Sequence, residues 1–172
     1  MLKLLFGSSL LMLLLSIHQC SEGKGANTSK KGSSDTLYIA INRTGCYGRC
    51  PIDKVELLPD GTVKYEGQRF VSRMGIYVRR LSDKEIEKVR RMLIEGKFDV
   101  YQEVYDNPHI TDLPSLILTY QMGSRKKRIL CRMDCPPELP EKIETLRAFL
   151  ADEGNFQMIQ GPEEDNSNSN AD

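Results

Sequence analysis

Alternating apolar and polar positions predict strands over much of the first half of this chain. The clearest case is the segment 36–42, where Leu37, Ile39 and Ile41 fall on one face of an extended chain. Proline, aspartate and glycine at positions 59–61 carry the signal of a tight turn, so the runs on either side of it form a predicted hairpin. The strands predicted in this half are residues 36–42, 53–58, 63–66 and an extended stretch at 69–80 that bends at Gly75.

Apolar residues spaced three to four apart predict two helices. The first begins at Ser82, because Ser82 and Glu85 have the spacing of a capping box and the flanking Leu81 and Ile86 that of a hydrophobic staple. Gly96 offers the end of this helix. The apolar stripe of the first helix is Ile86, Val89, Leu93 and Ile94, and that of the second is Leu139, Ile143, Leu146 and Leu150, with Pro140 tolerated in the first turn.

Between the two helices the pattern predicts a loop and a second hairpin. Residues 98–113 show little periodicity, which indicates a long ordered loop. Residues 115–122 and 125–131 are strand-like and flank the turn Gly123-Ser124. This order of strands and helices predicts an α+β fold, in which an antiparallel sheet built from hairpins carries two helices packed on one face.

The amino-terminal residues have the pattern of an export signal. One positive charge at Lys3 precedes an apolar run at 4–17, which has the length of a signal-peptide core and is short for a membrane-spanning helix. Cys20 stands where a bacterial lipoprotein signal places its acylated cysteine, although the two residues before it are not the small ones that are usual. We predict a lipid anchor at Cys20; cleavage a few residues later, which would release a soluble protein, is the alternative.

The composition along the chain divides it into four parts. Residues 1–20 are the predicted signal peptide, and the small, polar, lysine-dotted residues 21–34 are predicted to be a flexible tether. Residues 35–160 provide enough chain for a single α+β domain. The acidic, Asn- and Ser-rich tail at 161–172 lacks large apolar side chains, so we predict that it is disordered. Lysine and arginine together number 24, as do aspartate and glutamate, and this balance gives no argument for nucleic acid as a partner.

Four of the five cysteines form two similar motifs within the predicted domain. Cys46 and Cys50 are separated by three residues and followed by proline, and Cys131 and Cys135 repeat that arrangement. In an exported chain such pairs favour disulfides, and four cysteines allow three complete pairings. A local bridge requires a turn, because four residues along a straight strand span ~13 Å. In the chain-entropy model, a disulfide that closes a local loop stabilises the fold by ~2 kcal/mol, and one that joins Cys46 to Cys135 by ~4.6 kcal/mol. These values rank the pairings by stability but do not choose between them, so the connectivity stays open.

Two other roles for these cysteines are considered. Four thiolates from two facing turns can bind zinc tetrahedrally, although an oxidising compartment counts against free thiols. A redox role for Cys46 and Cys50 is the second alternative, but dithiol enzymes usually have two residues between their cysteines rather than three. Structural disulfides, with no cofactor and no metal, are the favoured interpretation.

Three segments resemble a known family of exported bacterial proteins, the domain of unknown function family 6438. They are residues 44–51 (Thr-Gly-Cys-Tyr-Gly-Arg-Cys-Pro), 60–67 (Asp-Gly-Thr-Val-Lys-Tyr-Glu-Gly) and 111–114 (Thr-Asp-Leu-Pro). The resemblance covers about residues 37–150 and implies a signal-bearing or lipoprotein chain without an established activity. It also favours local pairing, Cys46 with Cys50 and Cys131 with Cys135, because the family motif carries its first pair without the second. Asp134-Cys135-Pro136 departs from the Gly-Ala-Pro step that the family pattern has there.

The remaining candidates are charged residues with a structural alternative. The basic run on the strand 125–131 can grip an anionic glycan, a lipid headgroup or a peptide carboxylate, but a solvated edge strand is the favoured interpretation. His109 and Asp112 lie in the long loop, and without an identifiable nucleophile they give little argument for hydrolysis. The residues weighed as weak binding candidates are Arg125, Lys126, Lys127, Arg128, His109 and Asp112.

Taken together, the sequence predicts an exported, lipid-anchored domain of the cell envelope that binds rather than catalyses. Its predicted partners are a membrane, through the anchor, and an envelope component or another exported protein. An envelope enzyme or thiol redox protein that uses Cys46 and Cys50 is the competing hypothesis.

Overall fold

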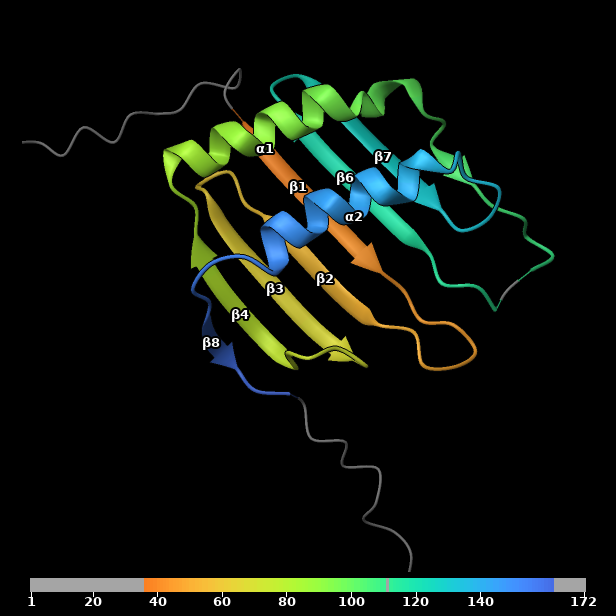
Figure 1. Ribbon diagram of the computed structural model, residues 1–172, viewed down its shortest axis with the longest axis horizontal. Coiled ribbons are helices and arrows are strands. Elements are labelled where there is room, and N and C mark those ends of the chain that lie inside the picture. The colour runs from red at the N-terminus through yellow and green to blue at the C-terminus, as the bar shows by residue number, and fades with distance from the viewer. Residues whose placement is uncertain (1–35, 111, 163–172) are drawn as a thin grey trace, which may run out of the picture. The chain divides into compact units, whose positions relative to one another are not determined.

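An eight-stranded sheet is the framework of residues 36–110 and 112–162, which the computed structural model describes (Figure 1). The strand order is β5-β7-β6-β1-β2-β3-β4-β8, so the first strand lies in the interior of the sheet. Every neighbouring pair is antiparallel except β5 and β7, which run parallel. The strands are β1 (Leu37–Arg43), β2 (Ile52–Leu57), β3 (Thr62–Arg69), β4 (Gly75–Arg80), β5 (Val104–Tyr105), β6 (Leu116–Met122), β7 (Arg125–Cys131) and β8 (Gln157–Gln160).

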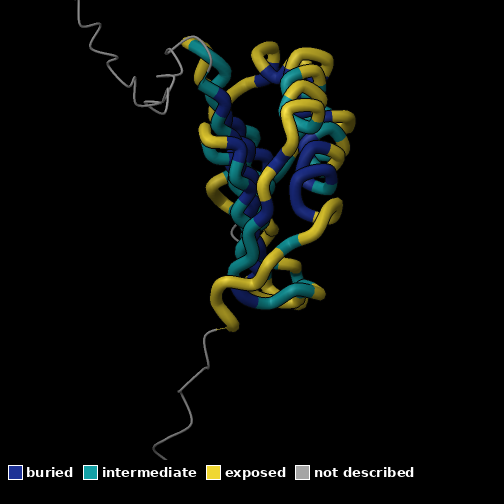
Figure 2. Tube along the Cα trace, turned by 90° about the vertical axis from the view of Figure 1, so that its left-hand side faces the viewer, coloured by how far each residue is buried: buried dark blue, intermediate teal, exposed yellow. Residues whose placement is uncertain are grey.

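Both helices cover the same face of the sheet, as predicted. In Figure 1, α1 (Asp83–Gly96) and α2 (Glu138–Ala151) lie in front of the strands, and the edge-on view in Figure 2 shows a sheet layer and a helix layer. The α+β prediction is therefore confirmed, with the parallel β5–β7 pair as the exception to the antiparallel rule. None of the described helices is long and apolar enough to cross a lipid bilayer.

The core lies between the sheet and the helices, and period-2 alternation places it there. Ile39 on β1 stands opposite Leu57 on β2 and Tyr120 on β6, and all three side chains are buried. Because a shift of one residue would turn every one of these side chains to the other face, burial fixes the register. Leu139, Ile143, Leu146 and Leu150, the predicted stripe of α2, are all at most 1% exposed.

The start of α1 has the predicted capping box. The Ser82 hydroxyl accepts from the Glu85 amide at 3.4 Å, and a Glu85 carboxylate oxygen accepts from the Ser82 amide at 2.8 Å. Arg79 on β4 donates to the other oxygen of Glu85 at 2.8 Å. The hydrogen bond from the Ser82 amide, together with the Ser82 hydroxyl and Arg79, lowers the pKa of Glu85 to about 2.

This lowered pKa makes the stability of α1 depend on pH. A carboxylate whose pKa is lower in the folded than in the unfolded chain stabilises the fold above its unfolded value of 4.5, and that contribution is lost as the pH falls towards about 2. We therefore expect the free energy of unfolding to fall more steeply in this range for the native chain than for Glu85→Gln. Urea unfolding at several pH values measures both, and equal slopes would contradict the prediction.

The other end of α1 differs from the prediction in two respects. The left-handed residue that ends the helix is Lys97, with φ 50°, rather than Gly96. Gly96 is helical and buried, and a side chain there would overlap the ring of Phe98. Glycine at this position therefore allows the Phe98 ring to pack closely against the helix. Ile94 is 57% exposed, because the face that packs on the sheet is made by Val89 and Leu93 while Ile94 lies to one side of it.

Three further segments differ from the expectation. The predicted loop at 98–113 contains a 3-10 turn (Phe98–Val100) and β5. The carbonyl of Glu103, just before β5, accepts a hydrogen bond from the Leu130 amide at 2.8 Å. The stretch predicted at 69–80 is interrupted, because β3 runs to Arg69 and β4 starts at Gly75. β8 was not predicted, since its four residues are all exposed and only its backbone pairs with β4. The signal peptide, the tether and most of the tail lie outside the described residues.

Candidate functional site

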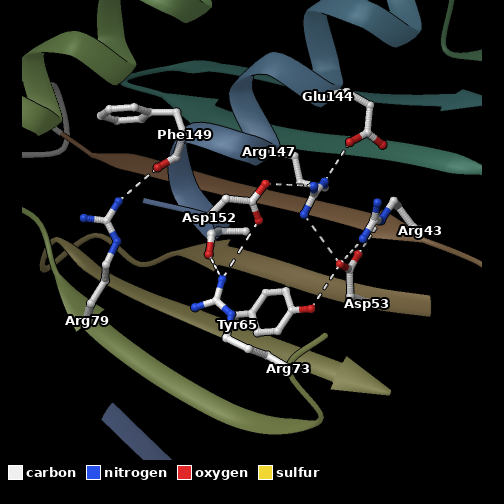
Figure 3. A network of polar contacts seen from close by, with 10 residues as sticks. Arg43, Asp53, Tyr65, Arg73, Arg79, Glu144, Arg147, Phe149 and Asp152 are labelled. Carbon is white, nitrogen blue, oxygen red and sulfur yellow. Dashed lines mark hydrogen bonds and ion pairs between the residues drawn. The ribbon is translucent and has the colours of Figure 1, made fainter. Parts of the chain in front are cut away.

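Asp53 is the buried centre of a polar cluster at one end of the sheet (Figure 3). Asp53 occupies the first inward-facing position of β2 and is only 3% exposed to solvent. Arg43 on β1 donates to both carboxylate oxygens, through Nε at 2.7 Å and through Nη2. The Tyr65 hydroxyl on β3 donates at 3.3 Å, and Arg147 on α2 places Nη1 at 3.5 Å. A buried carboxylate requires such partners, and this one joins three strands to a helix.

Arg147 links the same cluster to the end of α2. Its Nε donates to Glu144 at 2.7 Å and its Nη2 to Asp152 at 3.3 Å, while its side chain is 10% exposed. The guanidinium therefore contacts three carboxylates. Because these contacts fix its plane, Arg147 holds the last turns of α2 at one position above β2.

Burial and charge set the protonation states within the cluster. Burial, followed by the charge of Asp53 and the hydrogen bond to it, raises the pKa of Tyr65 to about 12. Burial acts to lower the pKa of Arg43, but its hydrogen bonds to Asp53 and the charge of that carboxylate raise it overall. Tyr65 is thus a hydrogen-bond donor, and Arg43 a cation, across the neutral range.

Arg73 approaches the cluster from the turn between β3 and β4. Its Cζ lies 4.6 Å from the ring centre of Phe156 and 4.8 Å from that of Tyr65, the distances of cation–π contacts. One of its Nη groups donates to the carbonyl oxygen of Ala151, and Asp152 is 3.9 Å away. These contacts hold Arg73 against the end of α2 and the segment that leads to β8.

A pocket of about 330 Å³ opens at this cluster. Three arginines and two aspartates line it, and residues 70–72 form part of its wall. Phe70 is 42% exposed and has a left-handed backbone, with φ 54°, a conformation in which a bulky residue is rare. Arg49 and Arg69 stack on its ring at 5.5 and 5.3 Å. The arginines and aspartates of the lining are Arg43, Arg73, Arg147, Asp53 and Asp152.

The structure brings the two cysteines of each motif to disulfide distance from one another. The Cα atoms of Cys46 and Cys50 are 5.7 Å apart and those of Cys131 and Cys135 are 5.8 Å apart. The first loop turns back at Gly48, whose amide donates to the Cys46 carbonyl at 2.9 Å, and it leads through Pro51 into the pocket wall. In the described part of the chain no three His, Cys, Asp or Glu side chains are grouped to hold a metal.

A comparison with models of protein families shows to which proteins this chain is related. A family model described as a domain of unknown function (DUF6438) matches residues 37–150. The chain belongs to this family. The match runs from β1 to α2, whereas β8 and Phe156 lie beyond it, so the ring that covers Arg73 comes from outside the matched residues. A comparison with curated proteins finds no match.

The basic run of this DUF6438 domain lies on an uncovered part of a strand. β7 pairs with β5 only through Leu130 and Cys131, so in the described chain no strand covers the outer side of residues 125–128. Arg125 forms an ion pair with Asp99 at 3.4 Å. This arrangement fits the solvated edge strand that we favoured, since charges there oppose pairing with other sheets.

The other two loop candidates do not join the pocket of the DUF6438 domain. His109 is exposed, and its amide donates to the side chain of Asn107 at 3.0 Å, as in an Asx turn. The carbonyl of Asp112 accepts from the Tyr47 amide at 3.3 Å, which joins the long loop to the first cysteine loop. Neither side chain lines the pocket.

Sequence reasoning missed the arginines and aspartates of the cluster, although a signal was present. Arg43 continues the inward phase of Ile39 and Ile41, and Asp53 is in phase with the buried residues of β2. A charged residue at a core-facing position indicates a buried partner of opposite charge. The contribution of Arg147 could not be predicted, because this residue is far from Asp53 along the chain.

Proposed function

We propose that this DUF6438 protein is a non-catalytic binding module of the bacterial cell envelope, held to a membrane through a lipid on Cys20. The observation that carries the proposal is the placement of both cysteine pairs at disulfide distance, with Cα atoms 5.7 and 5.8 Å apart. Disulfides form and persist in oxidising compartments, which fits the export-type pattern of residues 1–20. The partner in this proposal is an envelope component or another exported protein.

The proposed bridges have a structural role in this module. The bridge between Cys46 and Cys50 would fix the loop that follows β1 and enters β2 beside Asp53. The bridge between Cys131 and Cys135 would fix the segment between β7 and the start of α2. The first of these loops leads through Pro51 into the pocket, so the Cys46–Cys50 bridge would stabilise the wall of the pocket.

Thiol counting tests the disulfide part of the proposal. In protein exported to an oxidising compartment and unfolded without reductant, we expect no reactive thiol among these four cysteines. Peptide mapping should join Cys46 to Cys50 and Cys131 to Cys135. Thiols in the folded protein that react readily and cycle with a dithiol substrate would instead support the competing role as an envelope redox protein.

Fractionation tests the anchor. We expect the native chain, expressed in a bacterium with lipoprotein processing, to sediment with membranes and to carry the mass of acyl chains on Cys20. Cys20→Ala should remove the acyl mass and move the protein out of the membrane fraction. A matched Ser21→Ala variant should behave like the native chain. Identical fractionation of the native and Cys20→Ala proteins would contradict the anchor.

A further inference from the structure

We propose that the pocket lined by Arg43, Arg73 and Arg147 is a binding site for a small oxyanion, a carboxylate or phosphate group carried by the ligand of this module. The inference rests on the proposed role as a binding module and adds the chemistry that the module recognises. Guanidinium groups bind carboxylates and phosphates through paired N–H donors, and this pocket gathers three of them in about 330 Å³.

Two of the arginines have donor capacity left after their contacts with the protein. A guanidinium carries five N–H donors. Contacts within the described chain engage Nε and Nη2 of Arg43, both with Asp53, and Nη2 of Arg73, with the Ala151 carbonyl and Asp152. The side chains of Arg43 and Arg73 are 23% and 29% exposed, so both reach the pocket while their planes are held by the protein.

The charges around the pocket favour an anion over a cation. Its lining holds three arginines against two aspartates, and Arg147 is also paired with Glu144, so these side chains balance one another in charge. The excess of positive charge comes from Arg49 and Arg69, whose guanidinium groups lie over the ring of Phe70 beside the wall. Asp53 directs its oxygens at Arg43, Tyr65 and Arg147, so its charge is already compensated inside the cluster. A cationic ligand would face this excess of guanidinium groups, whereas an oxyanion would be attracted to it.

The backbone around the pocket is fixed in advance of binding. The turn after β3 packs so closely on Gly67 that a side chain at that position would overlap the carbonyl of Arg73. Phe70 has a left-handed backbone conformation, and two arginines lie over its ring. Strained residues of this kind are concentrated at ligand sites, and donors that are already oriented lose little entropy on binding.

The experiment is an NMR titration of the full chain with Cys20→Ala, so that no acyl chain inserts into the vesicles, purified after export and followed through its backbone amides. The probes are inorganic phosphate, acetate, and vesicles of phosphatidylcholine with or without phosphatidylglycerol. We expect a saturable change in the amides of residues 70–73 with phosphate or acetate. Arg73→Gln should weaken that binding about tenfold or more, because it removes a charge-assisted hydrogen bond to the oxyanion. Arg91→Gln, an exposed arginine on α1, is the matched control and should bind like the native chain.

A second variant keeps the test decisive if Arg73→Gln fails to fold. Arg69 stacks on Phe70 at 5.3 Å and is exposed, so Arg69→Gln should remain folded and bind the oxyanion about two- to threefold more weakly at low salt. Binding to phosphatidylglycerol vesicles that Arg73→Gln abolishes would identify a lipid headgroup as the source of the oxyanion. Vesicle binding that Arg73→Gln leaves intact, or no saturable change with any probe, would overturn the site.

Failure of this inference can be told apart from failure of the proposed function. If the protein has both disulfides and a membrane anchor but shows no oxyanion response, the result contradicts the proposed oxyanion site and leaves the proposed function standing. If residues 70–73 respond to the oxyanion in protein that is neither anchored nor disulfide-bonded, the result contradicts the proposed envelope function and supports the oxyanion site.

Discussion

Replacement of Asp53 by alanine is expected to lower the free energy of unfolding by about 3–5 kcal/mol, the loss that follows when one partner of a buried ion pair is removed. Asp53 is 3% exposed and is the only carboxylate that contacts both Arg43 and Arg147 among the described residues. Without it, Arg43 and the nearby Tyr65 hydroxyl would each lose a partner in a site that water reaches poorly.

Urea unfolding of matched variants measures this effect. Asp53→Asn keeps the shape of the side chain and some of its hydrogen bonds, so it should be less harmful than Asp53→Ala. Glu95→Ala, at an exposed position on α1, is the control and should change the free energy of unfolding by about 0.5 kcal/mol or less. A loss of about 1 kcal/mol or less in Asp53→Ala would show that the cluster does not hold α2 to the sheet.

Replacement of Phe98 by alanine is expected to have a similar effect, about 3–5 kcal/mol, for a different physical reason. The side chain is 1% exposed and fills the space beside Gly96 at the end of α1. Its ring centre lies 6.4 Å from that of Tyr101 and 6.3 Å from that of Tyr120. Truncation would remove buried apolar surface and leave a cavity among these rings.

The neighbouring Val100 provides the control for this prediction. Val100 belongs to the same 3-10 turn and is 75% exposed, so Val100→Ala should change the free energy of unfolding by about 0.5 kcal/mol or less. Thermal or urea unfolding of both variants tests the contrast. If Phe98→Ala and Val100→Ala were equally mild, the segment after α1 would contribute little to the core.

The parts of the fold that the sequence predicted are those with local causes. The capping box at Ser82 and Glu85 involves residues three apart, and the turn at 59–62 is set by proline and glycine. β8 could not be predicted in this way, because its side chains are exposed and its pairing with β4 is a property of the backbone. β5 likewise depends on a parallel partner that comes later in the chain.

The candidate site was predicted less well than the fold. The cysteine spacing indicated that a local bridge needs a turn, and the structure brings both pairs to disulfide distance over such turns. The pocket depends instead on Arg43, Asp53, Arg73 and Arg147, which come from β1, β2, a turn and α2. Their meeting follows from sheet register and helix docking, and a single sequence does not contain those long-range distances.

The position of β1 in the interior of the sheet also determines when this domain can finish folding. β1 pairs with β2 nearby in sequence, but its other neighbour, β6, begins only at Leu116. A chain made from its amino terminus can form the β1–β4 meander early, yet one edge of β1 stays open until β6 is synthesised. Such long-range closure is slow, and an open apolar strand invites pairing with other chains. A ribosome-stalled or proteolysed product that ends after α1 should therefore aggregate, whereas one that extends beyond β7 can close the sheet around β1.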